Sequence, residues 1–108
     1  MKITFLGTGT SQGVPIIQCD CEVCSSKDFR DKRLRTSLHI SDKELSLVID
    51  CGPDFRQQML NNGIRSLDAI IYTHEHADHT AGLDDIRPFY FLNDNPIPLF
   101  AEQIVLDQ

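Results

Sequence analysis

The residues best suited to chemistry in this sequence lie within six positions, His74-Glu75-His76-Ala77-Asp78-His79. Imidazole groups suit zinc, iron and related metals, and a carboxylate also accepts harder ions. An apolar run, Leu67 to Thr73, precedes the group and is typical of a buried strand. His74 and His76 are two apart, so on an extended segment their side chains leave on the same side. We therefore predict a metal site on a loop after a strand. The helical zinc-protease motif is excluded, because Asp78 stands where that motif needs His.

The elements that must position this loop follow from hydrophobic periodicity and turn residues. The sequence predicts strands at 2–6, 36–41, 45–49, 66–73 and 97–100, helices over 54–62, soon after 79 and over 101–108, and a turn at 93–96. Strand, helix and strand in succession favour a parallel pair with a right-handed crossover. Asp54 is predicted as the N-cap of the first helix, with Gln57 reaching back to it, and Gly63 as its stop. His39 is expected on the exposed, polar side of its strand.

A second group of metal-ligand types is Cys19-Asp20-Cys21-Glu22-Val23-Cys24. Three thiols this close can converge on one tetrahedral ion, and such spacing in a cytosolic chain favours zinc over disulfides. A closed structural site needs four ligands, so this run lacks one. His39 and Cys51 are the spare candidates, and free surface thiols are the alternative interpretation.

A glycine-rich segment, Gly7-Thr8-Gly9-Thr10-Ser11-Gln12-Gly13, follows the first predicted strand. Glycine permits close approach of a ligand, but an ordinary turn is the simpler interpretation. The third glycine comes one place too late for the dinucleotide-binding pattern. Arg35 and Arg87 are candidate phosphate contacts; for Arg87 a plain surface charge is favoured.

Length, composition and net charge limit the class of protein. With 108 residues, 41% of them hydrophobic and 24% charged, the chain is expected to form a single small globular domain. A net charge of -6 argues against extended nucleic-acid binding, although a small anionic substrate remains compatible with it. The N-terminal apolar run is too short for a signal peptide, and no stretch is long enough to cross a membrane. We expect a cytoplasmic protein.

The segment His74-x-His76-x-Asp78-His79 resembles the His-x-His-x-Asp-His motif of the metallo-β-lactamase-fold hydrolases. Further stretches are similar to the branch that holds the cyclic phosphodiesterase of phosphonate breakdown and tRNase Z: Leu6-Gly7-Thr8-Gly9 with Gly13 and Pro15, Cys19-x-Cys21-x-x-Cys24, and Gly82-Leu83-Asp84-Asp85-Ile86-Arg87-Pro88-Phe89. The resemblance implies an α/β fold, an αββα sandwich of two similar halves. Residues 1–108 would be a single incomplete domain, the N-terminal half. The chain would be a fragment, a truncated product or one completed by association.

The resemblance also implies a site for two divalent ions, zinc or manganese. His74 and His76 would hold one ion, and Asp78, taken as the catalytic residue, would hold the other with His79. Asp50 would brace the loop by hydrogen bonds; a plain strand-ending Asp is the alternative. The family's remaining ligands, two His and a bridging Asp, and its general acid come from downstream, and no His follows His79. Cys19, Cys21 and Cys24 would hold a structural zinc.

The function implied is metal-dependent hydrolysis of a small phosphodiester or related anion. A hydroxide held between two ions about 3.5–4 Å apart would attack phosphorus. The first alternative is a catalytically incomplete fragment that binds metal or forms a homo-oligomer through an uncovered sheet face. The second is an acyl or thioester hydrolase of the same fold, because fold alone does not settle chemistry. The glycine-rich opening and the cysteine run favour phosphodiesters.

Overall fold

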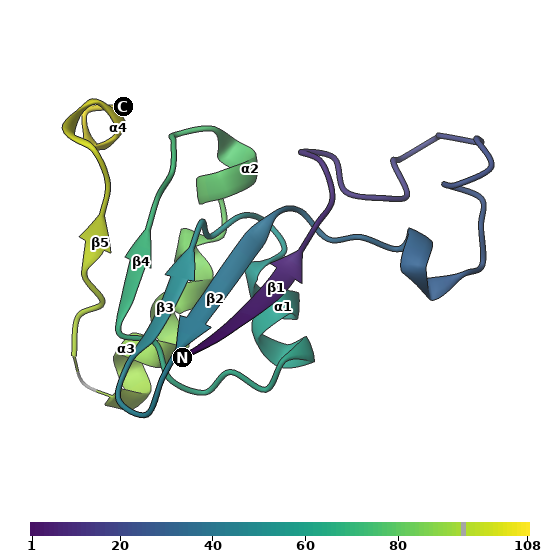
Figure 1. The fold of residues 1–108 in the computed structure, drawn as a ribbon. Helices are drawn as coiled ribbons and strands as arrows, with labels where there is room; N and C mark the ends of the chain where they lie inside the picture. The colour runs from purple at the N-terminus through teal and green to yellow at the C-terminus, as the bar shows by residue number, and fades with distance from the viewer. Residues whose placement is uncertain (94) are drawn as a thin grey trace.

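A five-stranded mixed sheet is the framework of the protein (Figure 1). The computed structural model describes residues 1–93 and 95–108. Its strands are β1 (Lys2–Gly7), β2 (Ser37–Ser41), β3 (Ser46–Ile49), β4 (Ala69–Ile71) and β5 (Leu99–Phe100), which lie in this order across the sheet. The pairs β1–β2 and β2–β3 are antiparallel, whereas β3–β4 and β4–β5 are parallel. The predicted parallel crossover from 45–49 to 66–73 is therefore confirmed.

Short helices connect these strands. They are α1 (Phe55–Asn61), α2 (Ala77–Thr80), α3 (Arg87–Asn93) and α4 (Gln103–Leu106), with 3-10 turns η1 (Phe29–Asp31) and η2 (Leu83–Ile86). Gly63 ends α1 as predicted, with a φ of 61° that favours glycine. None of the helices in 1–93 and 95–108 is long and apolar enough to cross a membrane.

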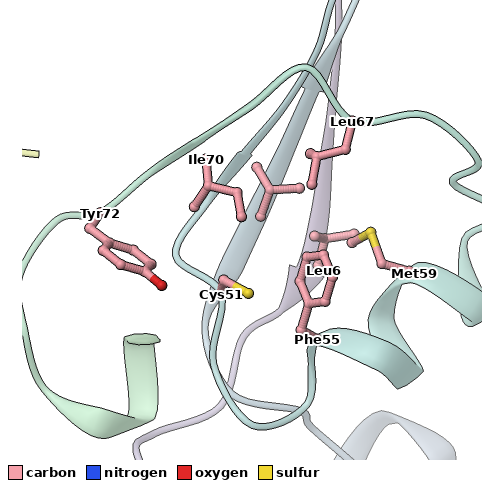
Figure 2. Packing of buried hydrophobic residues seen from close by; sticks show 8 residues of the cluster. Leu6, Cys51, Phe55, Met59, Leu67, Ile70 and Tyr72 are labelled. Atoms are coloured by element: carbon pink, nitrogen blue, oxygen red, sulfur yellow. The ribbon is translucent and has the colours of Figure 1, made fainter. Parts of the chain in front are cut away.

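The core lies between one face of the sheet and α1 (Figure 2). Val48 and Ile70 from the sheet and Phe55 from α1 are completely buried. Phe89 of α3 packs edge-on against Phe55, with ring centroids 6.3 Å apart. Each fully buried side chain of this kind contributes about 1.5–3 kcal/mol relative to an exposed one, so this layer holds α1 and α3 on the sheet.

The opposite face of the sheet is also apolar, and much of it is exposed. Strand register places Phe5 beside Leu38, Leu38 beside Ile49, Ile49 beside Ile71, and Ile71 beside Phe100. Phe5 is 71% exposed and Phe100 56% exposed. We call the following residues the apolar sheet face: Ile3, Phe5, Leu38, Ile40, Leu47, Ile49, Ile71 and Phe100.

Several predicted elements have different boundaries in the structure. The strand expected over 66–73 is assigned to Ala69–Ile71, and the one over 97–100 to Leu99–Phe100. The helix expected after His79 instead begins at Ala77, before that residue. Pro88 lies in the first turn of α3, where its missing N–H removes no helical hydrogen bond. The helix expected over 101–108 covers Gln103–Leu106, and the turn predicted at 93–96 includes Asp94, which lies outside the described residues.

The predicted capping box at α1 is wrong. Asp54 makes no side-chain cap hydrogen bond. Its carboxylate instead accepts from the backbone N–H of Arg35 (2.9 Å) and from its guanidinium (3.0 Å), and Gln57 donates to Asn61. A charged partner that arrives from a distant segment competes successfully with the local cap.

The expectation that His39 is exposed is also wrong. Its side chain is only 8% exposed, and its Nε2 lies 2.8 Å from the Oγ of Ser46. The polar side of β2 faces the helical layer, where His39 and the loop at 62–66 line an open pocket of about 450 Å³. Burial, reinforced by the charge of Lys2, lowers the pKa of this imidazole.

Candidate metal centre

The metal loop, residues 73–82, begins where two parallel strands end. Asp50 directly follows β3, and Thr73 and His74 come shortly after β4. Because β3 and β4 are parallel, their carboxyl ends meet at the same edge of the sheet. Side chains that are far apart in sequence therefore converge there, which is the usual location of ligand sites in such sheets.

Asp50 connects the end of β3 to the metal loop through its carboxylate. It is 3% exposed and has a φ of 66°, a left-handed conformation that Asp tolerates better than most residues. Its Oδ1 accepts from the backbone N–H of Thr73 (2.8 Å). Its Oδ2 accepts from the Thr73 hydroxyl (2.6 Å) and lies 2.7 Å from Nδ1 of His79. One buried carboxylate thus links both ends of the His-containing segment.

Backbone hydrogen bonds also hold the metal loop against Cys51, the residue after Asp50. The Cys51 N–H donates to the His79 carbonyl (2.8 Å), and the Gly82 N–H donates to the Cys51 carbonyl (2.9 Å). A Cβ at Gly52 would lie 2.2 Å from the Asp78 carbonyl oxygen, and one at Gly82 would lie 2.0 Å from the Gly52 carbonyl oxygen. Only glycine permits the two segments to approach this closely.

The three imidazole rings of the metal loop lie close to one another. The ring centroid of His74 lies 4.0 Å from that of His79 and 4.6 Å from that of His76. Nε2 of His79 lies 2.9 Å from Oδ2 of Asp78. One donor atom each from Asp50, His74 and His79 lies within 4.8 Å of the others. Two imidazoles and a carboxylate are a donor set that suits a divalent cation such as zinc.

The predicted ligands are brought together to different degrees. His74 and His79 belong to this group of donor atoms, Asp78 contacts His79, and His76 packs against the edge of the His74 ring. Asp50, predicted as a brace, both makes the bracing hydrogen bonds and places an oxygen among the donors. The hydroxyl of Thr73 has no counterpart in the sequence-based prediction, because nothing in the local sequence reveals its partners.

The three clustered cysteines also converge. Their Sγ atoms lie within 4.8 Å of one another, and backbone N–H groups of Ile16 and Cys24 donate to the sulfurs of Cys24 and Cys21 at 3.4 Å. The hydrogen bond from the Cys24 amide lowers the pKa of the Cys21 thiol. Thiolates at this spacing fit a zinc ion. They belong to a loop that projects from the sheet (Figure 1).

Neither spare candidate for the fourth ligand joins this cluster. Cys51 is completely buried in the core, where burial raises the pKa of its thiol to about 12 (Figure 2). His39 faces Ser46 on the sheet. Both proposals for a fourth ligand are therefore wrong, since the core and the sheet hold these side chains.

The glycine-rich segment packs against its own chain. The Gly9 N–H donates to the Leu34 carbonyl (2.7 Å), and a Cβ at Gly7 would lie 2.0 Å from the Arg35 carbonyl oxygen. The Arg35 guanidinium donates to the Ser11 carbonyl (2.7 Å) and to Asp54, so it braces this segment against α1. Arg87 is exposed and donates to the Asp84 carbonyl (2.9 Å), which agrees with the favoured surface role.

Residues 46–108, which include Asp50 and the whole metal loop, match the β-lactamase superfamily domain. The chain belongs to this superfamily. It carries the metallo-β-lactamase fold, as predicted, and covers the N-terminal part of that fold as seen in its relatives. The superfamily is one of hydrolases, so the class of chemistry predicted from the His-rich segment agrees with the family.

Individual relatives cover nearly all of the chain. The crystal structure of a diphosphatase from the PhnP family has a TM-score of 0.91 and 49% identity over 97% of this chain and 43% of its own. Zn²⁺-bound PqqB from Methylobacterium extorquens has a TM-score of 0.82 and 28% identity over 99% of this chain and 39% of its own. An octanoyltransferase of Porphyromonas gingivalis is 53% identical over 99% of this chain and 22% of its own length. The chain thus spans less than half the length of each of these relatives.

Proposed function

We propose that this metallo-β-lactamase-fold chain supplies the metal-binding half of a hydrolase that cleaves P–O bonds in a small anionic substrate. The observation that carries this proposal is the buried Asp50 carboxylate, which accepts from Thr73 and lies 2.7 Å from Nδ1 of His79, so that the motif is held at the carboxyl ends of two parallel strands. Such a preorganised loop is what a divalent ion requires.

The proposed ligands are the residues predicted from the motif. His74 and His76 would hold one ion, and Asp78 and His79 a second, while Asp50 braces the loop; the cysteine cluster would hold a structural zinc. Divalent ions held by these residues would lower the pKa of bound water towards about 7 and neutralise charge on phosphoryl oxygens. The zinc in PqqB supports a divalent metal of this kind.

The chain's own residues set the orientation of these ligands. With Asp50 as a carboxylate, which only accepts hydrogen bonds, Nδ1 of His79 carries the proton of the 2.7 Å contact. Its Nε2, 2.9 Å from Oδ2 of Asp78, is then the ring nitrogen that would share an ion with that carboxylate. Because the loop is tied to Cys51 by two backbone hydrogen bonds, this orientation is preset before any ligand binds.

The family branch and the net charge support the proposed substrate class. The PhnP-family diphosphatase, similar over nearly the whole chain, supports attack at phosphorus and makes a diphosphate the second candidate beside a phosphodiester. The octanoyltransferase name supports acyl transfer less, because the match covers 22% of that protein. A net charge of -6 favours a small substrate over a long nucleic acid.

The test is an assay of the full chain with zinc or manganese against three probes: bis(p-nitrophenyl) phosphate, a nucleoside diphosphate and p-nitrophenyl octanoate. We expect hydrolysis of a phosphorus substrate that disappears in His76→Ala and Asp78→Ala. Lys43→Ala, an exposed change in the turn between β2 and β3, is the matched control. Full activity in either ligand variant, or hydrolysis of the octanoate alone, contradicts the proposal.

A second candidate function is metal binding without turnover, coupled to self-association. The exposed apolar sheet face favours it, because a contiguous apolar surface usually marks an interaction site. The same assay separates the two candidates: stoichiometric metal with no hydrolysis of any probe supports the second.

A further inference from the structure

Two hydrogen-bond partners of one hydroxyl group suggest how the first histidine of the motif is oriented. The Oγ1 of Thr73 lies 2.6 Å from Oδ2 of Asp50 and 2.9 Å from Nδ1 of His74. We propose that Thr73 is a positioning residue that fixes the tautomer of His74, so that one buried carboxylate controls two imidazoles. This inference deepens the proposed metal site and rests on it.

The proton count decides the direction of each bond. A hydroxyl has one proton to donate, and an ionised carboxylate can only accept. The Thr73 proton therefore points to Asp50, and the hydroxyl oxygen accepts the bond from Nδ1 of His74. His74 must then carry its proton on Nδ1, which leaves the lone pair of Nε2 free for a metal ion.

The same carboxylate oxygen fixes the tautomer of His79. Oδ2 of Asp50 also accepts from Nδ1 of His79 at 2.7 Å. Asp50 thus presents Nε2 of His79 directly and Nε2 of His74 through the Thr73 hydroxyl. The Thr73 backbone N–H donates to Oδ1 (2.8 Å), so the carboxylate itself cannot rotate away without losing a further bond.

The side chain of Thr73 contributes little else. The residue is exposed, so its methyl group adds little to the core. Thr73→Val keeps the shape and the backbone N–H bond but removes the hydroxyl, whereas Thr73→Ser keeps the hydroxyl. Thr36→Val is the matched control, because the Thr36 hydroxyl donates to a backbone carbonyl, that of Gly9 (2.8 Å), outside the loop.

The first readout is the tautomer of each histidine in the metal-free full chain, read from long-range ¹H–¹⁵N NMR couplings of the imidazoles at a pH where they are neutral. We expect His74 and His79 to be protonated on Nδ1. Thr73→Val should convert His74 to a mixture or to the Nε2–H form without changing His79, while Thr73→Ser and Thr36→Val should match the unsubstituted chain.

The second readout is zinc affinity, measured by competition with a chromophoric chelator. Loss of a group that orients a metal ligand typically weakens binding about 10–100-fold, so Thr73→Val should fall in this range and Thr73→Ser should recover most of the affinity. His74 protonated on Nε2 in the unsubstituted chain overturns the inference, as does a Thr73→Val chain with unchanged tautomer and affinity. Failure of the unsubstituted chain to bind zinc contradicts the proposed function instead, and the NMR result still tests Thr73.

Discussion

The Nδ1 atom of His79 lies 2.7 Å from Oδ2 of Asp50, across 29 residues of sequence. This contact ties the end of β3 to the C-terminal part of the metal loop. Asp50 is 3% exposed, so water does not compete effectively for its oxygens. A hydrogen bond to a charged group that is shielded in this way is stronger than an exposed one, and it determines where the imidazole points.

Replacement of Asp50 by Asn should weaken metal binding without disrupting the fold. Asn tolerates the φ of 66° at this position, but its uncharged amide is a poorer acceptor for two donors on one oxygen. We expect zinc affinity to fall about 10–100-fold, as measured by chelator competition. Asp42→Asn, in an exposed turn where Oδ1 accepts from backbone N–H groups, is the control. Equal affinity in both variants would show that Asp50 does not brace the ligands.

Gly52 and Gly82 should be among the least replaceable positions in the chain. Alanine at either puts a Cβ 2.2 Å or less from a backbone oxygen of the facing segment, so the loop must move. We expect each variant to lower the free energy of unfolding in urea by about 2–4 kcal/mol. Gly63→Ala meets no atom within 4 Å and carries only the left-handed backbone penalty, about 1–2 kcal/mol. A smaller loss at Gly52 than at Gly63 would contradict the close approach.

The features that the sequence predicted correctly depend on local patterns. The apolar run before His74 and the alternation at 2–6 and 36–41 predict strands, and Gly63 predicts a helix end. The resemblance implied that Asp50 braces the loop, and Asp50 does accept from Thr73 and lie against His79; the pairing of His74 with His76, and of Asp78 with His79, on two ions stays a prediction.

The features that it missed depend on partners that only the tertiary structure supplies. Thr73 is 23 residues from Asp50, and nothing around it distinguishes its hydroxyl from any exposed one. The errors at Asp54 and His39 have the same origin. Asp54 contacts the distant Arg35, and His39 packs against Ser46 in a pocket shared with the loop after α1, so each local interpretation was overridden.

His39 should make the fold sensitive to mild acid. Its pKa is lowered in the folded chain by burial and then by the charge of Lys2, while an unfolded histidine has a pKa of about 6.5. The unfolded chain therefore binds the proton more readily, and stability present above about pH 6.5 is lost as the pH falls through the folded-state pKa. Urea unfolding between about pH 5.5 and 8 should show this loss, which His39→Gln should reduce. An identical pH dependence in both chains would exclude this role.

The four cysteines should fall into two classes of reactivity. Cys19, Cys21 and Cys24 lie in a projecting loop, whereas Cys51 is completely buried and has a pKa raised to about 12. A chromogenic disulfide reagent should therefore react with three thiols in the native chain and with the fourth only in urea. Zinc should slow the three, and excess chelator should restore their rate. Rapid reaction of Cys51 would contradict its burial, and no effect of zinc would contradict the proposed structural site.

The apolar sheet face should cause the chain to self-associate. Phe5 and Phe100 are more than half exposed there, and burial of this surface against a second copy would remove apolar area from water at about 25 cal/mol per Å². Sedimentation velocity should therefore show a coefficient that rises with protein concentration. Phe5→Glu places a charge on that face and should shift the distribution to monomer. Ile17→Glu changes a side chain that is 91% exposed in the loop at 15–28, so it controls for added charge alone. A monomer at every concentration, or equal association of the two variants, would assign no role to this face, since the charge of Phe5→Glu must disrupt any contact that buries it.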